Sequence, residues 1–398
     1  MQAKCVSDIK TLRVRIKDRH AKVLTELAQE VNLVWNFTQD LSLKCLQRER
    51  RFMSAFDMAA YTKGAGKEGL RLHSQTVQAV TEEYCTRRKQ FRQAKLRWRV
   101  SRGSRRSLGW IPFKAVGISF KSGQLHYGKL PLGLWDSYGL SHYELGAGSF
   151  SEDSRGRWYA NVTVKIKELC GPSLPRPVKA VGIDLGLREF AAFSDVDIEA
   201  VQAHRFYRDL EPALATAQRA GKKHRVKTLH AKIANRRKDA LHKLSTRLVK
   251  KYGVIVVGNV SSSKLAKTKL AKSVLDAGWS TFKAQLFYKS RWAATLFKEV
   301  NESFSTQDCS ACGARAGPNG IKALGVTHWT CNSCGIVHDR NRNAAVNILL
   351  KGLLEIDKEQ PATVEMRVFE AVVNKDSGAC GSMAGPGLRP LVAGIPYL

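Results

Sequence analysis

Acidic residues are scarce in this chain. Its 398 residues hold 34 Asp and Glu against 66 Lys and Arg, which gives a formal net charge of +32. Such a charge repels itself unless a polyanion neutralises it, and here it is clustered instead of evenly spread. The imbalance predicts a nucleic-acid partner and argues against a merely solubilising cationic surface.

Long apolar runs are also missing. No segment approaches the roughly 20 apolar residues that a membrane-spanning helix needs, and the N-terminal residues lack the apolar core of a secretory signal. We therefore expect no membrane contact and a cytoplasmic, bacterial protein associated with the nucleoid. A hydrophobic content of 43% with 25% charged residues predicts a folded chain of two or three domains.

Cysteine is sparse outside one region. Four of the nine cysteines form the pairs Cys309-x2-Cys312 and Cys331-x2-Cys334, with eighteen residues between the pairs. This spacing matches a tetrahedral four-thiolate zinc ribbon and not a disulfide framework. A closed four-cysteine site has no open position for water, so we predict structural zinc that serves folding and not chemistry.

Basic residues concentrate in two segments. Residues 85–106 hold ten Lys or Arg and no acid, and residues 219–250 hold twelve with one acid, Asp239. Lys and Arg neutralise phosphates, and aromatic rings such as that of Trp98 stack on bases. The predicted nucleic-acid-binding residues are Arg87, Arg88, Lys89, Arg92, Lys95, Arg97, Trp98, Arg99, Arg236, Arg237, Lys238 and Lys243.

Hydrophobic periodicity changes along the chain at a Pro-rich linker, residues 171–177. Before it, the pattern predicts a strand, two helices and then short strands, over residues 11–16, 21–48, 74–99 and 107–167. After it, short buried strands alternate with helices, which is typical of an α/β sheet. The expected strands are 178–183, 190–193, 254–257 and 296–300, and the expected helices are 211–250 and 273–292.

One acid stands where an α/β sheet collects a ligand site. The strand over residues 178–183 delivers Asp184 into the sequence Gly-Ile-Asp-Leu-Gly, with residues 190–193 as its expected hairpin partner. Ligand sites of such sheets lie at the carboxyl ends of the strands. Mg²⁺ prefers oxygen ligands, but a lone Asp after a strand is usually only a turn residue, so a metal-binding role for Asp184 depends on the family resemblance of its motif.

These motifs together resemble the TnpB family of transposon-encoded RNA-guided nucleases, the ancestors of type V CRISPR effectors. The resemblance is specific from about residue 178 to 350. It covers Asp184, His242-Lys243-Leu244-Ser245, Asp276-x2-Trp279, Ser305-Thr306-Gln307, the cysteine pairs and the segment from His338 to Ala345.

The resemblance implies an α/β fold whose RuvC-like (RNase H-like) domain carries an inserted zinc ribbon. A small β-barrel-like wedge domain with an inserted helical recognition domain would precede it. The implied ranges are 1–20 and 107–172 for the wedge, 21–106 for the recognition domain, 178–304 and 336–352 for the RuvC-like domain, 305–335 for the ribbon, and 353–398 for a partly disordered tail. The implied partners are one guide RNA per protein chain and a double-stranded DNA target with a short flanking motif.

The chain departs from the family at two of its three acids. Gly258 stands where the second acid would end a strand, and Asn341 stands where the third acid would be. Glu302 is either a relocated ligand on the neighbouring strand or an ordinary exposed acid. Asp339 reaches the site only if its segment is a loop, because a two-residue offset on a helix turns a side chain about 200° away.

The leading interpretation is an RNA-guided, sequence-specific DNA-binding protein with a degraded nuclease site, a repressor of the TldR type. The alternative is an active endonuclease that uses Asp184, Glu302 and Asp339, with Mg²⁺ as cofactor only in that case. A third reading, a zinc-ribbon DNA-binding protein without a guide, leaves the RuvC-like motifs unexplained.

Overall fold

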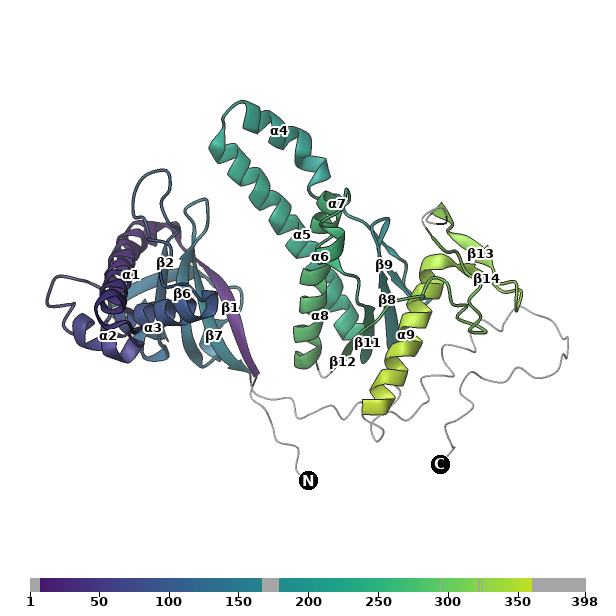
Figure 1. Ribbon diagram of the computed structural model, residues 1–398, viewed down its shortest axis with the longest axis horizontal. Helices are drawn as coiled ribbons and strands as arrows, with labels where there is room; N and C mark the ends of the chain where they lie inside the picture. Colours follow the sequence, from purple (N-terminus) through teal and green to yellow (C-terminus); the bar gives the residue numbers. More distant parts are fainter. Residues whose placement is uncertain (1–7, 167–178, 294, 321–322, 324, 360–398) are drawn as a thin grey trace, which may run out of the picture. The chain divides into compact units, whose positions relative to one another are not determined.

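The computed structural model describes residues 8–166, 179–293, 295–320, 323 and 325–359, and the chain divides into two compact units, residues 1–168 and 169–398 (Figure 1). The predicted linker over residues 171–177 and the end of the predicted tail from residue 360 lie outside the described residues. No helix in the described ranges is long and apolar enough to cross a membrane. Each unit is described by itself below.

The first unit contains an antiparallel sheet of seven strands in the order β2-β6-β7-β1-β5-β4-β3. Strand β1, the first strand of this unit in sequence, pairs with β7, the last one. The expected β-rich domain is therefore present, but β2 and β3 are edge strands among the described residues, so main-chain pairing does not close the predicted barrel. The strands are β1 (Asp8–Ile16), β2 (Trp110–Phe113), β3 (Ile118–Lys121), β4 (Gln124–Tyr127), β5 (Leu130–Trp135), β6 (Leu145–Glu152) and β7 (Trp158–Ile166).

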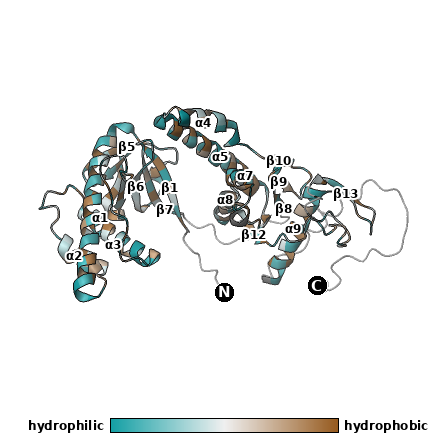
Figure 2. Cartoon of the chain, turned by 45° about the horizontal axis from the view of Figure 1, so that its top comes forward, coloured by the Kyte–Doolittle hydropathy of each residue, from teal (hydrophilic) through white to brown (hydrophobic). Residues whose placement is uncertain are grey.

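Three helices stand between β1 and β2 in the chain: α1 (Ala21–Glu49), α2 (Ala55–Thr62) and α3 (Ser74–Phe91). Hydrophilic and hydrophobic residues alternate along α1 (Figure 2), and its buried stripe includes Leu24, Val31 and Trp35. This stripe shares one core with inward residues of the sheet such as Leu12 and Val162. A helix with one apolar stripe is stabilised mainly by burying that stripe, which explains the helical insertion.

The second predicted helix is shorter than its sequence pattern suggested. It was expected to reach Arg99, but α3 ends at Phe91 because Arg92 adopts a left-handed backbone with φ of 51°. Beyond it, amide side chains of α1 hold the chain in a non-helical course. The Gln39 side chain accepts from the Leu96 amide at 2.8 Å, and the Asn36 side chain accepts from the Arg99 amide at 2.9 Å. These tertiary hydrogen bonds override the local helical pattern.

The second unit is built on a five-stranded mixed sheet in the order β10-β9-β8-β11-β12. Strand β8 is parallel to β11 and β11 is parallel to β12, whereas β8 and β9 form an antiparallel hairpin. The four predicted strands and the predicted hairpin are confirmed. The strands are β8 (Ala180–Leu185), β9 (Glu189–Phe193), β10 (Val201–Gln202), β11 (Val254–Gly258) and β12 (Leu296–Val300).

Helices cover both faces of this sheet. Ile183 and Val257 share a core with Leu248 and Phe282 of the long helices, on one face. The alternate position Val256 packs with Ile348 on the other face. The helices are α4 (Glu211–Arg219), α5 (Lys223–Lys251), α6 (Ser262–Leu265), α7 (Ala271–Ala277), α8 (Trp279–Trp292) and α9 (Arg340–Glu359).

Two helices expected to be continuous are each broken by a glycine. The segment 211–250 forms the hairpin of α4 and α5, which turns at Gly221 with φ of 63° (Figure 1). The segment 273–292 divides into α7 and α8 at Gly278, with φ of 72°. Glycine adopts this backbone region without the steric cost that a side chain brings, so each break falls at a residue suited to it.

Helix α9 extends beyond residue 352, where the RuvC-like domain was predicted to end. The tail was expected to begin at residue 353, but α9 continues to Glu359 because Leu353 and Ile356 are buried against the sheet core. The small hairpin of β13 (His328–Thr330) and β14 (Val337–Asp339) precedes this helix and carries the second cysteine pair in its turn.

Candidate metal centre and nucleic-acid surface

Three elements bring their ends together at one edge of the mixed sheet. Asp184 and Gly258 occupy the ends of the parallel strands β8 and β11, at positions that alternate toward α9. Gly182 lets α9 approach closely, since a Cβ there would overlap the Ala345 carbonyl oxygen. The first residues of α9 therefore reach the edge where Asp184 stands.

Glu302 occupies the space that a side chain at position 258 would take. A Cβ placed on Gly258 would lie 2.5 Å from Oε2 of Glu302 and 3.1 Å from its Cβ. The Oε2 atom is buried without a hydrogen-bond partner among the described atoms. Glu302, which follows β12, therefore lies beside the end of β11, and its role as a relocated ligand stays a prediction.

Charged neighbours shift the pKa of Asp184 in opposite directions. Burial raises the pKa of the Asp184 carboxyl to about 7, and the negative charges of Glu302 and Glu189 add to the rise, while Arg340 at the start of α9 opposes it. Burial also raises the pKa of Glu302, which Lys283 and the Val260 amide counteract. A carboxyl whose pKa is raised by burial and by neighbouring carboxylates is stabilised in its charged form when a cation binds beside it.

Glu189 is a residue of this site that the sequence analysis missed. It begins β9, and its Oε2 accepts a hydrogen bond from Nδ2 of Asn341 at 3.0 Å. Its position five residues after Asp184, in the same hairpin, is the only signal that the sequence offered. The third-acid position is thus an amide that contacts a carboxylate.

Asp339 lies elsewhere, which corrects the expectation that it joins Asp184. Its Oδ1 accepts from the backbone amide of Arg342 at 2.7 Å, which caps the first turn of α9. Its Oδ2 lies 3.9 Å from Nε2 of His328, the first residue of β13. A cap side chain of this kind accepts a hydrogen bond from an amide of the first helical turn that would otherwise lack a partner.

The donor set at this edge suits a hard divalent cation. Carboxylate oxygens such as those of Asp184 and Glu302 are ligands that Mg²⁺ prefers. A buried oxygen without a hydrogen bond is costly unless a cation or proton satisfies it, and Oε2 of Glu302 is such an atom. The residues therefore fit the metal that a RuvC-like fold implies.

The four cysteines form the predicted metal cluster. Their sulfur atoms all lie within 4.8 Å of one another, and the pairs Cys309–Cys334 and Cys312–Cys331 are both 3.7 Å apart. Thiolates around tetrahedral zinc, with bonds of about 2.3 Å, stand about 3.8 Å apart. The geometry is consistent with structural zinc.

Two asparagines join this cluster to α9. The side-chain amides of Asn343 and Asn347 donate to the carbonyls of Ser305 and Asp308, just before the first cysteine pair. The Asn343 oxygen accepts from the amide of Ser310, inside that pair. These hydrogen bonds therefore fix the start of α9 to the backbone around the first cysteine pair.

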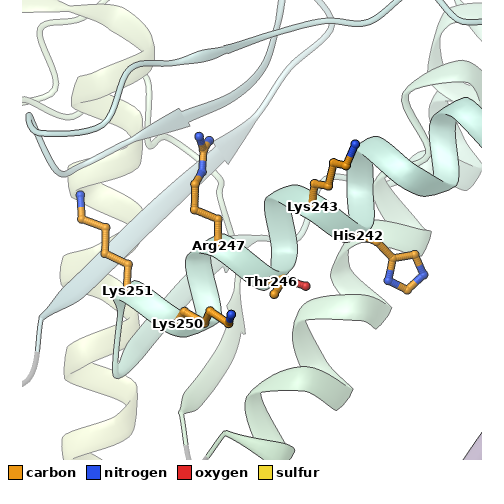
Figure 3. Close-up of a pocket in the computed structure, with 6 residues that line it drawn as sticks. All are labelled: His242, Lys243, Thr246, Arg247, Lys250 and Lys251. Carbon is orange, nitrogen blue, oxygen red and sulfur yellow. The ribbon is translucent and has the colours of Figure 1, made fainter. Parts of the chain in front are cut away.

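Cations line one side of α5 near its end, over a shallow hollow (Figure 3). Its lining residues are His242, Lys243, Thr246, Arg247, Lys250 and Lys251. Of the residues predicted in α5 to bind nucleic acid, Arg236, Lys238 and Lys243 are exposed. Arg237 instead pairs with the buried Asp276 at 2.6 Å and supports the fold.

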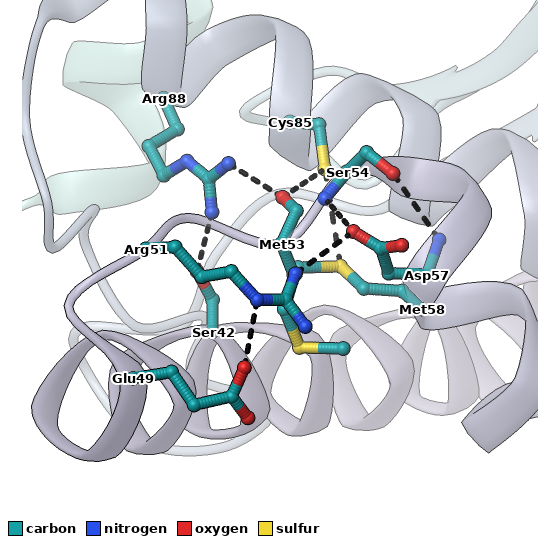
Figure 4. Close-up of polar contacts among 9 residues, drawn as sticks. All are labelled: Ser42, Glu49, Arg51, Met53, Ser54, Asp57, Met58, Cys85 and Arg88. Carbon is teal, nitrogen blue, oxygen red and sulfur yellow. Dashed lines mark hydrogen bonds and ion pairs between the residues drawn. The ribbon is translucent and has the colours of Figure 1, made fainter.

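In the first unit the burial of Arg88 corrects its predicted role. This side chain is 4% exposed, donates to the Met53 carbonyl at 2.7 Å and also contacts Ser42 (Figure 4). Arg99 is half-buried and donates to Asn32 and to the Leu108 carbonyl. The remaining predicted residues of the segment are exposed: Arg87, Lys89, Arg92, Lys95, Arg97 and Trp98.

Two family descriptions match consecutive parts of the chain. Residues 161–269 match OrfB_IS605, described as "Probable transposase", and residues 279–348 match the TNB domain of Cas12f1-like proteins. The residues matched by these two descriptions include Asp184, Glu302, Asn341 and the four cysteines.

Curated relatives match part of the chain. A Streptomyces pristinaespiralis protein named "Putative RNA-guided DNA endonuclease" is 35% identical over 215 residues, which are 51% of this chain and 52% of that protein. A TnpB-like protein of Methanocaldococcus jannaschii is 32% identical over 139 residues, which are 32% of this chain and 48% of that protein. The chain spans about half the length of the curated relatives it matches.

The fold is also found in a solved structure. The protein chain in a cryo-EM structure of a Cas12f1–sgRNA–target DNA complex matches 86% of this chain and 98% of its own length, with a TM-score of 0.53 and 12% identity. At this identity the likeness shows a shared mixed α/β fold.

Proposed function

We propose that this chain is an RNA-guided DNA-binding protein whose RuvC-like site, built on Asp184 and Glu302, cleaves DNA with Mg²⁺. One observation carries the nuclease part: Glu302 fills the space beside Gly258, so the edge of the sheet keeps a second carboxylate. The printed names of the relatives and the fold of the Cas12f1 chain support the RNA-guided part.

The residues divide the work of cleavage. When bound, Mg²⁺ lowers the pKa of a water nucleophile and stabilises the leaving oxygen of the phosphodiester. Asp184 and Glu302 would hold the metal, and Arg340, whose charge acts on Asp184, is placed to oppose the negative charge of a phosphate. Burial raises the pKa of the Glu302 carboxyl, and Lys283 and the Val260 amide oppose this rise by favouring the charged form.

The cationic surfaces supply the affinity for nucleic acid. A net charge of +32 with exposed Lys and Arg on α5 and after α3 favours a phosphate backbone. This term is independent of sequence, so a guide RNA would choose the DNA target by base pairing.

The test begins with the RNA that co-purifies with the full chain. Sequencing that RNA identifies the guide, and matched duplex DNA is then offered with Mg²⁺ to the wild-type chain and to Asp184→Asn. The proposal predicts cleavage by the wild type and binding without cleavage by the variant. Cleavage that is equal in both, or a wild type that binds no RNA, would contradict it.

Asn341 favours a second candidate function, an RNA-guided repressor with an inactive nuclease. An amide at the third-acid position removes a charge that the family uses to hold metal. In that case the wild type and Asp184→Asn would bind the matched target equally and silence a reporter promoter equally, with no strand cleavage on either.

A further inference from the structure

A cavity of about 320 Å³ lies in the second unit, on the face of the mixed sheet that packs against α5 and α7. Its apolar lining includes Phe190 of β9 with Leu241 and Leu244 of α5, which belong to the core on that face. Ile183 and Leu185 also belong to that core, so Asp184 between them alternates to the opposite face. The cavity is therefore separate from the candidate metal site, and its volume suits a small ligand.

The segment over residues 203–208 forms one wall of this cavity and is fixed at both ends. The amide of Ala203 donates to the Arg188 carbonyl at 3.3 Å, and the amide of Tyr207 donates to Oδ2 of Asp276 at 2.8 Å. Nζ of Lys272, in α7, lies 5.9 Å from the centroid of the Tyr207 ring. The wall is thus held to the β8–β9 hairpin and to α7, so the cavity is formed before a ligand enters.

Two aromatic rings and two cations line the cavity. The rings of His204 and Phe206 have centroids 4.9 Å apart and planes tilted by 36°. The guanidinium groups of Arg188 and Arg205 are exposed and pair with no carboxylate among the described residues. Bases stack on aromatic rings, and guanidinium groups bind phosphate, so this combination fits a nucleotide better than a purely apolar ligand.

The carboxylate of Asp276 gives the cavity a means to select a base. This residue is 4% exposed and lines the cavity, and its Oδ1 accepts from Nη2 of Arg237 at 2.6 Å. A carboxylate offers about four acceptor positions, so the bonds from Tyr207 and Arg237 leave one on each oxygen. Guanine presents two adjacent N–H donors on its Watson–Crick edge, whereas adenine, cytosine and uracil place an acceptor beside each donor.

We propose that this cavity binds a guanine nucleotide, whose base donates its N1–H and N2–H groups to Asp276. The base stacks beside His204 and Phe206, and the phosphate lies against Arg188 and Arg205. The nucleotide is either free or one extruded residue of a bound strand, because the same chemistry recognises both. The site requires neither a metal at Asp184 nor cleavage, so it adds a ligand to the proposed function and does not rest on it.

The first test is equilibrium dialysis of guanosine 5′-monophosphate against the full chain, after bound RNA has been removed with ribonuclease and high salt. Inosine 5′-monophosphate lacks the N2 amine, and we expect it to bind about tenfold more weakly, because a hydrogen bond to a charged group is lost. This change on the ligand leaves Asp276 intact, which matters because Asp276 also holds Arg237 in the fold.

Paired variants then locate the binding. His204→Ala removes a stacking ring and should weaken binding of guanosine 5′-monophosphate about tenfold. Arg205→Gln should remove the advantage of the monophosphate over guanosine. The matched controls are His224→Ala and Arg225→Gln, which change exposed residues of α5 outside the cavity lining and should bind as the wild type does. Thermal melting of each variant shows that the fold persists.

The second test distinguishes a free nucleotide from a residue of a strand. It compares the affinities of a uridine heptamer and of heptamers with one central guanosine or inosine. A strand-borne ligand predicts that the guanosine heptamer binds about tenfold more tightly than the other two, and that His204→Ala removes this advantage. A free ligand predicts equal heptamers together with a preference for the guanosine monophosphate over the inosine monophosphate.

Two results would overturn the inference. One is the absence of any guanine preference, both among the monophosphates and among the heptamers. The other is a guanine preference that persists unchanged in His204→Ala and Arg205→Gln, which would place the binding elsewhere on the basic surface. Neither result affects the proposed nuclease, because cleavage of matched DNA and its loss in Asp184→Asn are measured separately.

Discussion

Oε2 of Glu302 lies where the side chain of Gly258 would extend, only 2.5 Å from an ideal Cβ at that glycine. The two residues stand at the ends of neighbouring parallel strands, β11 and β12, which are paired up to Gly258 and Val300. Parallel neighbours end at one edge of a sheet, so an acid can move from one strand to the next and still serve one site.

Gly258→Ala tests this relationship. The new methyl group would also meet Cδ1 of Ile348 at 3.1 Å, so Glu302 must move out of its place. We expect weaker Mn²⁺ binding and a loss of about 1 kcal/mol in stability from overpacking, measured by metal titration and denaturant unfolding. Gly325→Ala is the control, because a Cβ there has nothing within 4 Å; equal effects in both variants would contradict the relationship.

Asp184 should make the metal-free protein sensitive to pH. Its folded pKa of about 7 is raised above the ordinary value of 3.8, so the folded state binds the proton more tightly than the unfolded state. The resulting penalty is complete above about pH 7 and is relieved as the pH falls toward 4.

At pH 8 in EDTA, the free energy of unfolding of Asp184→Asn should consequently exceed that of the wild type by about 1 kcal/mol or more. The variant should therefore unfold at a higher denaturant concentration. The difference should shrink toward zero at pH 4. Urea unfolding at several pH values measures it, with Glu199→Gln as the exposed control. A stability difference that does not vary with pH would show that the charged form of Asp184 does not destabilise the folded protein.

Removal of zinc should affect α9 as well as the ribbon. Asn343 and Asn347 hold the backbone next to the first cysteine pair, so a released metal frees the start of α9, which carries Arg340 and Asn341. We expect Cys331→Ser or chelation to lower the melting temperature and to speed amide exchange in the first turns of α9. Readdition of Zn²⁺ should restore the wild type but not the variant, and unchanged exchange in α9 would show that the two parts are independent.

Neighbouring basic residues on α3 should separate stability from binding. Arg88→Ala leaves the Met53 carbonyl without its buried partner and should cost about 2 kcal/mol or more in unfolding free energy. Lys89→Ala, one residue on and exposed, should leave stability within about 0.5 kcal/mol. RNA affinity measured in salt titrations should fall for Lys89→Ala; a stable, weakly binding Arg88→Ala would reverse the assignment.

The cations at the end of α5 should bind phosphate. A triple variant of Lys243, Arg247 and Lys250 to Ala should weaken RNA binding and lower the slope of log affinity against log salt by about 0.7–0.9 for each lost phosphate contact. Lys165→Ala, which removes an exposed lysine of β7 paired with Glu144, is the control. Equal slopes for the triple variant and the control would remove this surface from the nucleic-acid path.

Features that depend on the local spacing of residues were predicted correctly from the sequence. Cys309 and Cys312 come together because a two-residue interval fits one knuckle, and their cluster with the second pair follows the zinc-ribbon spacing. The buried strand β11 was predicted because its uninterrupted apolar run fits a strand covered on both faces. The broken helices were not predicted, since single glycines at 221 and 278 are tolerated in a helical pattern and only the packing selects the turn.

The sequence by itself predicted a polyanion partner, a shared site for four cysteines and the position of Asp184 at the end of a strand, because charge balance, ligand spacing and strand patterning are local properties. Only the tertiary structure decided that Glu302 stands beside Gly258, that Glu189 meets Asn341 and that Arg88 is buried. Those contacts join residues that lie 44, 152 and up to 46 positions apart. Their partners are fixed by how sheet and helices pack, which no local pattern encodes.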